Sequence, residues 1–409
     1  MKSFPTLRTV KNAKFEEQWS VALLCSDLAI AATVLFFVGT HMVESETMVR
    51  VVGIDPGTRS FDLCGINDGK VFLDTSIPST QIAENPESLI EVLKSAMPLD
   101  LIVAPSGYGL PLTHISKLGQ REHFLTILVR PDDLKISVLK GLRKLVNMMK
   151  DEGFNAFFIP GVIHLPTVPE YRKVNKIDMG TADKLCCAVL AIHDQSQRLG
   201  IPYSQTSLIL VEMGFGYNAI IAVEDGQIVD GIGGTTGGLG FLTMGAMDGE
   251  LAYLLGGFSK ETLFQGGAAY VASNGAVTPE MLVEGARSDR MKKVALDAFV
   301  DSVLKSVAAI AVSVKHPREI LISGRISRVQ KIYEIIHGRL STFGQVRKVD
   351  RFAEVSKEAA QGAALIADGL AGGRFKELVE ATKIKEATGT VLDHIYLPNA
   401  GALKRKYGL

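Results

Sequence analysis

The strongest constraint on the fold is a hairpin pattern that occurs twice in the chain. The first copy begins with the run RVVGIDPGT at residues 50–58 and reaches an Asp-Gly turn at residues 68–69. When the sequence is shifted by 157 positions, Asp55 coincides with Glu212, and the Asp-Gly turn coincides with a second one at residues 225–226. The apolar positions of three short strands coincide as well. The same acid-x-Gly turn, followed at the same spacing by the same turn pair, indicates an internal duplication.

Each copy predicts three antiparallel strands. In the first copy we expect strands at residues 50–55, 62–67 and 71–77, joined by a glycine turn and by the tight turn NDGK. In the second copy the same pattern covers residues 207–232. Each opening strand ends on a carboxylate that is followed by a glycine, which lets the backbone of the turn approach a ligand closely.

Two such hairpins that faced one another across a cleft would present carboxylates and backbone N–H groups to a polyphosphate. We expect Asp55 and Glu212 to hold Mg²⁺ through its water ligands. The N–H groups and hydroxyls of the turns would then hold phosphate oxygens. The residues expected to line the phosphates are Gly57, Thr58, Ser60, Gly214 and Gly216.

These residues carry a resemblance to a known superfamily. The stretches GIDPGT and VEMGFGYN resemble the two phosphate motifs of acetate and sugar kinases, heat-shock chaperone ATPases and actin, with Glu212 where the second motif usually has an aspartate. The chain over about residues 48–409, and particularly the stretch NKIDMGTADKLCCAVLA, most resembles an archaeal family described as predicted butyrate kinases. The resemblance implies an α/β fold, namely the duplicated ribonuclease-H-like fold of actin-like ATPases. It also implies that ATP and Mg²⁺ bind in a cleft between two domains with mixed sheets.

The resemblance also implies residues that act on the acceptor. Thr181 is the expected N-cap of a helix, which places Asp183 in the first turn. The stretch GTADK resembles the GxDR segment of type III pantothenate kinases, in which the acid lies beside the acceptor, although this chain has a lysine in place of the arginine. The proline-rich loop at residues 160–174 resembles the His–Pro loop of acetate kinases. It would offer His164 and Arg172 to a carboxylate or to the transferring phosphoryl group.

Two further stretches are expected near the nucleotide. The run GIGGTTGGLGF, at residues 231–241, matches neither the dinucleotide nor the P-loop pattern. Its glycines nevertheless indicate backbone close to a ligand, with Gly234 and Thr235 as the expected contacts. The run LISGRI has the strand-to-helix geometry of a phosphate or adenosine edge. It resembles the adenosine motif of the superfamily, which usually has two glycines, and we expect Ser323 and Gly324 on the nucleoside side.

The composition bears on partners and location. Lys plus Arg and Asp plus Glu number 44 each, so the net charge favours neither nucleic acid nor an anionic membrane as a ligand. The four cysteines show no CxxC spacing, which favours reduced thiols and a cytoplasmic location. Residues 21–39 are apolar and follow a basic segment. This leaves a mis-assigned start, a membrane anchor and a removed signal peptide as interpretations of residues 1–47, and a membrane partner is expected only for a true anchor.

We therefore predict three segments and one preferred activity. The segments are an extension at residues 1–47, a first actin-like domain at 48–204 with an acceptor-side insertion, and a second at 205–409 with the adenosine motif and the C-terminal helices. The preferred activity is Mg–ATP-dependent phosphorylation of a small acceptor, by preference a short-chain carboxylic acid, to an acyl phosphate. A nucleotide-driven switch that acts on a protein partner stays open, as does a kinase of a hydroxyl acceptor, in which Asp183 must act as the base. A homodimer is left open as the assembly state.

Overall fold

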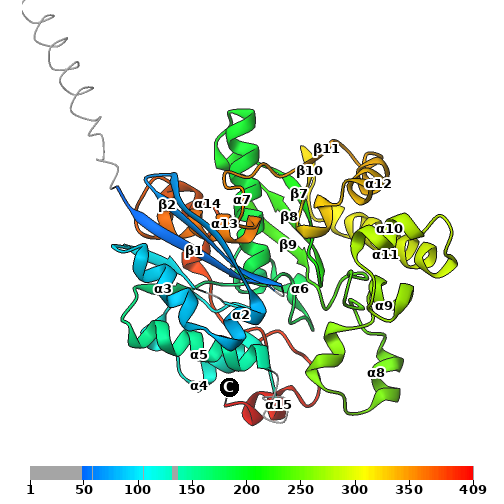
Figure 1. The fold of residues 1–409 in the computed structure, drawn as a ribbon, viewed down its shortest axis with the longest axis horizontal. Coiled ribbons are helices and arrows are strands. Elements are labelled where there is room, and N and C mark those ends of the chain that lie inside the picture. Colours follow the sequence, from blue (N-terminus) through cyan, green and yellow to red (C-terminus); the bar gives the residue numbers. More distant parts are fainter. Residues whose placement is uncertain (1–47, 58, 105, 131–136, 409) are drawn as a thin grey trace, which may run out of the picture. The chain divides into compact units, whose positions relative to one another are not determined.

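The computed structural model describes residues 48–57, 59–104, 106–130 and 137–408 (Figure 1). The predicted extension at residues 1–47, with its apolar segment at 21–39, lies outside these residues. Within the described part of the chain, no helix has both the length and the apolar character needed to cross a membrane.

The strands form two mixed sheets that share one topology. In the first sheet a three-strand antiparallel hairpin is continued by parallel strands, with the order β3 (Lys70–Pro78), β2 (Ser60–Asn67), β1 (Arg50–Pro56), β4 (Leu101–Val103), β6 (Ala156–Phe158) and β5 (Thr113–His114), the last antiparallel to β6. In the second sheet the equivalent order is β9 (Gln227–Ile232), β8 (Asn218–Glu224), β7 (Leu208–Met213), β10 (Glu319–Ser323) and β11 (Val346–Lys348).

The α-helices occur between the strands and after the last strand. In the first half of the chain they are α2 (Ser79–Glu84), α3 (Glu87–Ser95), α4 (Gln120–Ile127), α5 (Ser137–Asp151), α6 (Glu170–Lys173) and α7 (Ala182–Leu199). In the second half they are α8 (Gly249–Leu255), α9 (Ala268–Ser273), α10 (Pro279–Gly285), α11 (Arg290–Ala311), α12 (Gln330–Leu340), α13 (Glu358–Leu370), α14 (Lys376–Ala381) and α15 (Ala400–Lys406).

The register of the strands preserves the repeat seen in the sequence. Asp55 lies opposite Asp62 across β1 and β2. The equivalent pair across β7 and β8 is Glu212 and Ala219, and each of these residues lies 157 positions after its counterpart in the first pair. The second and third strands of each hairpin also show a register shift at equivalent places. The aspartates of the two tight turns have the same left-handed φ of 51°. The three-strand hairpins predicted from the sequence are therefore confirmed in both halves.

Strand β7 is buried on both faces because its side chains alternate between two cores. Leu208 and Leu210 belong to the core that contains the first sheet, whereas Ile209 and Val211 belong to a separate core with helix α11. A strand covered on both sides needs apolar residues at every position. This is why the acid at its end, Glu212, stands out in the sequence.

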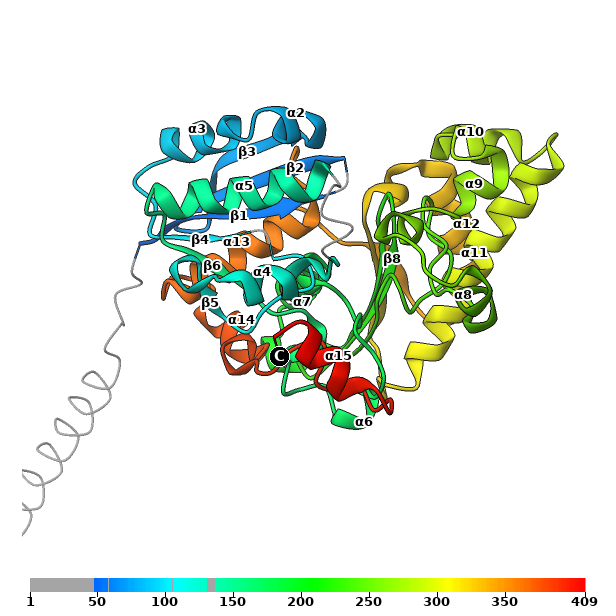
Figure 2. The ribbon, with the colours of Figure 1, turned by 90° about the horizontal axis from the view of Figure 1, so that it is seen from below.

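Helices α7 and α13 lie between the two sheets (Figure 2). Helix α13 packs on β1 and on α7, and α7 packs on β7 and β8. The two helices approach so closely that a Cβ built on Gly362 would lie 1.9 Å from the carbonyl oxygen of Cys186. Through these contacts each helix begins beside the hairpin of the other half. The predicted domain boundary between residues 204 and 205 stays a prediction.

Candidate functional site

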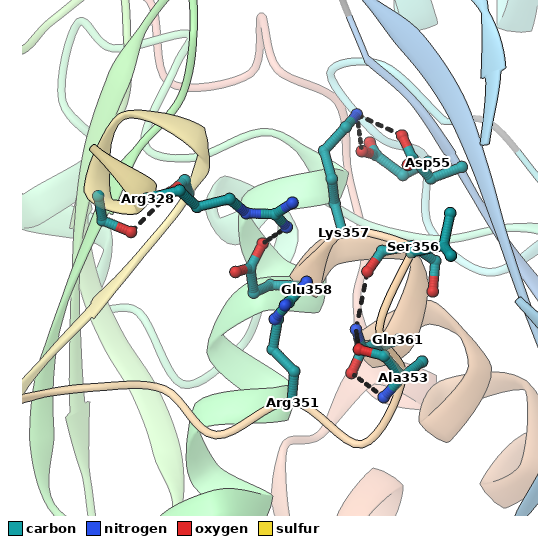
Figure 3. A network of polar contacts seen from close by, with 12 residues as sticks. Asp55, Arg328, Arg351, Ala353, Ser356, Lys357, Glu358 and Gln361 are labelled. Carbon is teal, nitrogen blue, oxygen red and sulfur yellow. Dashed lines mark hydrogen bonds and ion pairs between the residues drawn. The ribbon is translucent and has the colours of Figure 1, made fainter. Parts of the chain in front are cut away.

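The first acidic turn is held by a lysine from the far end of the chain. Asp55, the predicted metal ligand at the end of β1, is buried. The Nζ atom of Lys357 lies 3.0 Å from Oδ2 of Asp55 and 2.6 Å from Oδ2 of Asp62 (Figure 3). The hydroxyl of Ser60 donates to Asp62 over 2.9 Å, and the N–H of Gly57 donates to the carbonyl of Ser60 over 3.0 Å. Thr58, the remaining predicted contact in this turn, lies outside the described residues.

The second acidic turn repeats this arrangement with a lysine from α7. Glu212 is buried at the end of β7, and its Oε2 lies 2.6 Å from Nζ of Lys184. The same ammonium group lies 3.0 Å from Oδ2 of Asp183, which is in the first turn of α7 as the sequence predicted. The N–H of Gly214 donates to the carbonyl of Tyr217 over 3.0 Å, which matches the bond inside the first turn. The predicted residue Gly216 continues this turn, and its carbonyl accepts bonds from residues 242–243.

The two turns belong to one electrostatic environment. Burial raises the pKa of both Asp55 and Glu212. Lys357 opposes the rise at Asp55, and Lys184 opposes it at Glu212. Repulsion from Asp183 raises the pKa of both acids further. Burial pushes the pKa of Asp183 upward too, but Lys184 and a short hydrogen bond from the Thr181 hydroxyl outweigh it and hold the pKa below the usual value. Asp183 therefore lies close enough to both acids to raise the pKa of each.

Lys357 is placed by a loop that is anchored on the first sheet. Oxygens of Asp74 in β3 accept hydrogen bonds from the backbone N–H groups of residues 354–356 at 2.7 to 2.8 Å. The side-chain amide of Gln361 in α13 donates to the carbonyls of Ser356 and Ala353 at 2.8 and 3.2 Å (Figure 3). These bonds fix the residues immediately before α13 and direct Lys357 toward Asp55.

A cavity of about 440 Å³ adjoins the first turn. Its lining joins residues of the first hairpin to residues of the second half, namely Arg59, Ser60, Asp62, Ser76, Phe215, Val277, Thr278, Pro279, Glu280, Arg325, Arg328, Val329, Val355 and Lys357. The guanidinium carbons of Arg59 and Arg325 lie 4.3 and 5.6 Å from the centre of the Phe215 ring. No acid among the described residues lies within ion-pair distance of either arginine. Arginines without an acid partner on a cavity wall are suited to bind an anion.

The predicted nucleoside contacts lie beside the second acid. Ser323 ends β10 directly opposite Glu212 in the parallel register, and its buried hydroxyl has no hydrogen-bond partner within the described chain. Gly324 has a φ of 90°, and a Cβ at this position would lie 2.6 Å from Oε1 of Glu212 and 2.4 Å from the carbonyl oxygen of Met213. The second acidic turn therefore requires glycine at position 324, and the nucleoside contact predicted for Ser323 and Gly324 stays a prediction.

The glycine-rich loop is attached to the residues that precede α7. Both the N–H and the hydroxyl of Thr235 donate to Oδ2 of Asp178, over 2.9 and 3.1 Å. A Cβ built on Gly234 would lie 2.5 Å from the ring of Tyr217. These contacts join the loop to both halves of the chain, and they explain the small residue at position 234 without a ligand. The nucleotide contact predicted for Gly234 and Thr235 stays a prediction.

His164 is a buried histidine that contacts its own loop and the C-terminal segment, where the N–H of Thr388 donates to its carbonyl over 3.1 Å. Its Nδ1 accepts a hydrogen bond from the N–H of Gly161 over 3.2 Å, and the ring is 3% exposed. The pKa of His164 is lowered to about 4, mainly by burial, which the hydrogen bond with Gly161 opposes and the nearby Lys173 reinforces. This shift favours the neutral imidazole near pH 7.

Arg172 lies in the short helix α6, within the stretch expected to be a loop, and joins this helix to the second hairpin. Its guanidinium donates to the carbonyl of Val229 over 2.8 Å, and its Nε lies 3.6 Å from Oδ2 of Asp230. Asp230 also accepts a hydrogen bond from the Ser313 hydroxyl over 2.7 Å. His164 and Arg172 thus have partners within the fold, and the catalytic roles predicted for them are not tested by these contacts.

Sequence reasoning missed most of the cations at the site. Lys357 was passed over because its partner acid lies 302 positions away in the chain. Arg59 and Phe215 stand inside the two turns that were singled out, in GTRSF and GFGYN, and their position there was the available signal. Arg325 directly follows the predicted contact Gly324. A basic residue in the first phosphate turn and one directly after Gly324 were the signals that could have identified Arg59 and Arg325.

The donor set at the turns fits a divalent cation that keeps much of its water. The two ammonium groups face four carboxylates, those of Asp55, Asp62, Asp183 and Glu212. When all four are ionised, the excess of two negative charges equals the charge of one Mg²⁺. Within the described ranges, no three acidic, histidine or cysteine side chains are arranged as a ready metal centre. Magnesium is usually held by one or two carboxylates together with waters and substrate phosphates, so a preformed cage is not required.

Comparisons with known proteins agree with this architecture. A family model with the description "Protein of unknown function (DUF1464)" matches residues 53–397. No curated relative matches the sequence. A propionate kinase from Francisella tularensis superposes with a TM-score of 0.55 at 14% identity, over 77% of this chain and 99% of that chain.

Two acetate kinase structures give similar values. The enzyme from Porphyromonas gingivalis has a TM-score of 0.54 at 14% identity, over 77% of this chain and 98% of its own. That from Entamoeba histolytica has a TM-score of 0.52 at 13% identity, over 72% of this chain and 87% of its own. At such low identity these likenesses show the fold alone. The predicted fold class, a mixed α/β actin-like ATPase fold with two mixed sheets, is confirmed.

Proposed function

The chain belongs to the family DUF1464, whose description assigns no activity, and we propose that it is an ATP-dependent kinase of a small acceptor. One observation carries the proposal. The acids that end β1 and β7 lie in one electrostatic environment around Asp183, beside a basic cavity of about 440 Å³. A nucleotide has the charge and size for such a place, because its phosphates need cations and small turns while its base needs a wall of apolar or planar groups.

Each part of the site then has a role. Asp55 and Glu212 would hold magnesium, which would supply positive charge to the phosphate chain. Gly57 and Gly214 keep the two turns narrow enough for the phosphates to approach. Ser60, Thr58 and Gly216 complete the predicted phosphate contacts, with Gly234 and Thr235 on the glycine-rich loop. Ser323 and Gly324 lie on the nucleoside side, where Arg325 and Phe215 of the cavity wall would contact the base or ribose.

A carboxylate is the acceptor that this site favours. The pKa of Asp183 is held below its usual value by Lys184 and Thr181 despite its burial, which makes it a weak base. A hydroxyl acceptor needs a base to remove its proton, whereas a carboxylate is already ionised at pH 7. We therefore assign Asp183 to orienting the acceptor. The fold likeness to acetate and propionate kinases is compatible with this choice, and so is the resemblance of the sequence to predicted butyrate kinases.

The test is to supply the full chain with ATP, Mg²⁺ and a panel of acceptors. Acetate, propionate, butyrate and longer acids form one set, and pantothenate-like alcohols and sugars form the other. Acyl phosphate is trapped with hydroxylamine, and total ADP is measured in parallel. We expect a hydroxamate from at least one short-chain acid. ADP formed only with an alcohol would favour the hydroxyl acceptor, and hydrolysis without any phosphorylated product would favour the switch.

Substituted chains test the acceptor-side residues in the same assay. Asp183→Asn should weaken turnover with the preferred acid and leave the pH profile unchanged, because no proton is taken from a carboxylate. His164→Asn and Arg172→Gln test the two roles that the sequence predicts. A loss confined to turnover, with an unchanged midpoint of unfolding, would support a role at the acceptor. Loss of stability alone would assign them to the fold.

A further inference from the structure

The two acidic turns share a feature that the repeat in the sequence does not contain. Each acid is held by an ammonium group delivered at the start of a helix, Lys357 before α13 and Lys184 in the first turn of α7. These lysines do not correspond under the shift of 157 positions. Two independent parts of the chain therefore supply the same group to equivalent places.

Both ammonium groups lie against the glycine of the turn. A Cβ built on Gly57 would lie 2.3 Å from Nζ of Lys357, and one built on Gly214 would lie 3.5 Å from Nζ of Lys184. The phosphate chain is expected at these two glycines. The lysine head groups therefore occupy space next to the expected phosphate oxygens.

One backbone donor of each acidic turn already has a partner within its own turn. The N–H of Gly57 already donates to Ser60, and that of Gly214 already donates to Tyr217. The two lysines therefore add charged donors next to the glycines of the turns. Their side chains are 19% and 15% exposed, so neither lysine is fully enclosed by the protein.

Neither lysine neutralises its surroundings. Lys357 lies within ion-pair distance of two carboxylates, Asp55 and Asp62, and Lys184 lies within that distance of Asp183 and Glu212. One ammonium between two carboxylates leaves a net negative charge. Such a cluster attracts a further cation, and once that cation is present the lysine is no longer needed by the acids.

We propose that Lys184 and Lys357 are exchangeable counter-cations of the nucleotide site. In the chain without nucleotide each ammonium shields a pair of carboxylates. When the magnesium nucleotide binds, each lysine transfers its hydrogen bonds to phosphate oxygens, and the carboxylates it leaves are neutralised by the divalent ion. This inference rests on the proposed nucleotide binding and extends it, because it assigns these two lysines to the phosphates and predicts that they compete with the metal.

Competition between each lysine and the divalent ion for the same carboxylates leads to a prediction that a purely structural ion pair would not make. Removal of a lysine should strengthen the binding of a divalent ion alone and weaken the binding of nucleotide. A Coulomb energy of several kcal/mol is available between charges at about 4 Å near a protein surface. The change in each affinity should therefore reach about tenfold, since this needs only about 1.4 kcal/mol.

The experiment uses the full chain and two probes. Mn²⁺ alone is titrated while the free ion is followed by electron paramagnetic resonance, and ATP binding with Mg²⁺ is measured by calorimetry. The variants are Lys184→Gln, Lys357→Gln and the control Lys305→Gln, whose side chain is 78% exposed in α11. We expect both site variants to bind Mn²⁺ about tenfold more tightly and ATP about tenfold more weakly. The control should match the unsubstituted chain with both probes.

The conservative variants Lys184→Arg and Lys357→Arg guard against loss of folding. They keep the charge at each position, so they should bind Mn²⁺ as the unsubstituted chain does. If folded glutamine variants bind Mn²⁺ no more tightly than the unsubstituted chain, the exchange is excluded even though nucleotide binding stands. If the unsubstituted chain binds no nucleotide, the proposed function itself fails, and this inference fails with it.

Discussion

Nζ of Lys357 lies 3.0 Å from Oδ2 of Asp55, although 302 positions separate the two residues in the chain. The pair joins the start of α13 to the end of β1, and both side chains are largely buried. Because Asp62 shares the same ammonium group at 2.6 Å, loss of the lysine leaves two buried carboxylates facing one another. This contact therefore links the stability of the fold to the charge of the site.

The first prediction concerns the stability of this cluster. Lys357→Met should lower the free energy of unfolding by about 3–5 kcal/mol, because removal of one partner leaves buried charge uncompensated. Addition of Asp55→Asn to Lys357→Met should recover part of the loss, because one of the two stranded charges is then removed. Urea unfolding of the single and double variants measures both effects. A double variant that is less stable than Lys357→Met would contradict this account.

The second prediction concerns the contact between α7 and α13. Gly362→Ala would place a methyl group 1.9 Å from the Cys186 carbonyl oxygen, where only backbone movement could relieve the overlap. We expect a loss of about 3 kcal/mol, at the upper end of the usual cost of overpacking. Gly338→Ala in α12 is the matched control, since nothing lies within 4 Å of its Cβ. It should stabilise the chain by up to about 1 kcal/mol, the helix propensity of alanine over glycine. Equal effects of the two changes on the unfolding midpoint would refute the close contact.

The third prediction concerns acid stability. Burial lowers the pKa of His164 to about 4, whereas the unfolded chain has the ordinary value near 6.5. The stability that depends on neutral His164 is therefore present above pH 6.5 and is lost as the pH falls toward 4, because the unfolded chain takes up a proton that the folded chain excludes. We expect this residue to contribute about 2–3 kcal/mol of the loss.

The measurement is the free energy of unfolding at several values between pH 7 and pH 4. His164→Asn keeps an acceptor for the N–H of Gly161 and has no group that titrates, so its stability should fall less steeply with pH. The exposed His316→Asn should keep the slope of the unsubstituted chain. If His164→Asn also keeps that slope, the buried neutral imidazole is not the cause.

The hairpins could be predicted because their signals are local. Alternating apolar residues and a tight Asp-Gly turn determine strand pairing over fewer than thirty residues, and the acids at the strand ends are visible at once. The first turn of α7 was predictable for the same reason, since a capping residue precedes an apolar stripe. The repeat then indicated that Glu212 occupies a position in its sheet equivalent to that of Asp55, which one copy alone could not show.

The lysines could not be predicted from such signals. Lys184 and Lys357 become site residues only because α7 and α13 cross between the sheets, and that crossing is a tertiary feature. His164 and Arg172 were selected for their chemistry, and their partners Gly161 and Asp230 lie within the fold, so the acceptor roles of these two residues stay predictions. Residue type and loop position alone cannot separate a buried structural side chain from one that faces a ligand.

The last prediction concerns the geometry around Glu212. Gly324→Ala adds a methyl group that would lie 2.6 Å from Oε1 of Glu212 and 2.4 Å from the carbonyl oxygen of Met213, at a φ of 90°. Gly344→Ala is the control, because its φ of 155° is also unfavourable for alanine but nothing lies within 4 Å of its Cβ. Both variants should lose about 1 kcal/mol or more to backbone strain. Only Gly324→Ala should also displace the carboxylate and weaken the binding of magnesium nucleotide, by about tenfold for each 1.4 kcal/mol of lost interaction. Calorimetry with ATP and Mg²⁺ measures the nucleotide affinity of each variant and so separates displacement of the carboxylate from backbone strain alone. Equal nucleotide affinities in the two folded variants would show that Glu212 is not part of the nucleotide site.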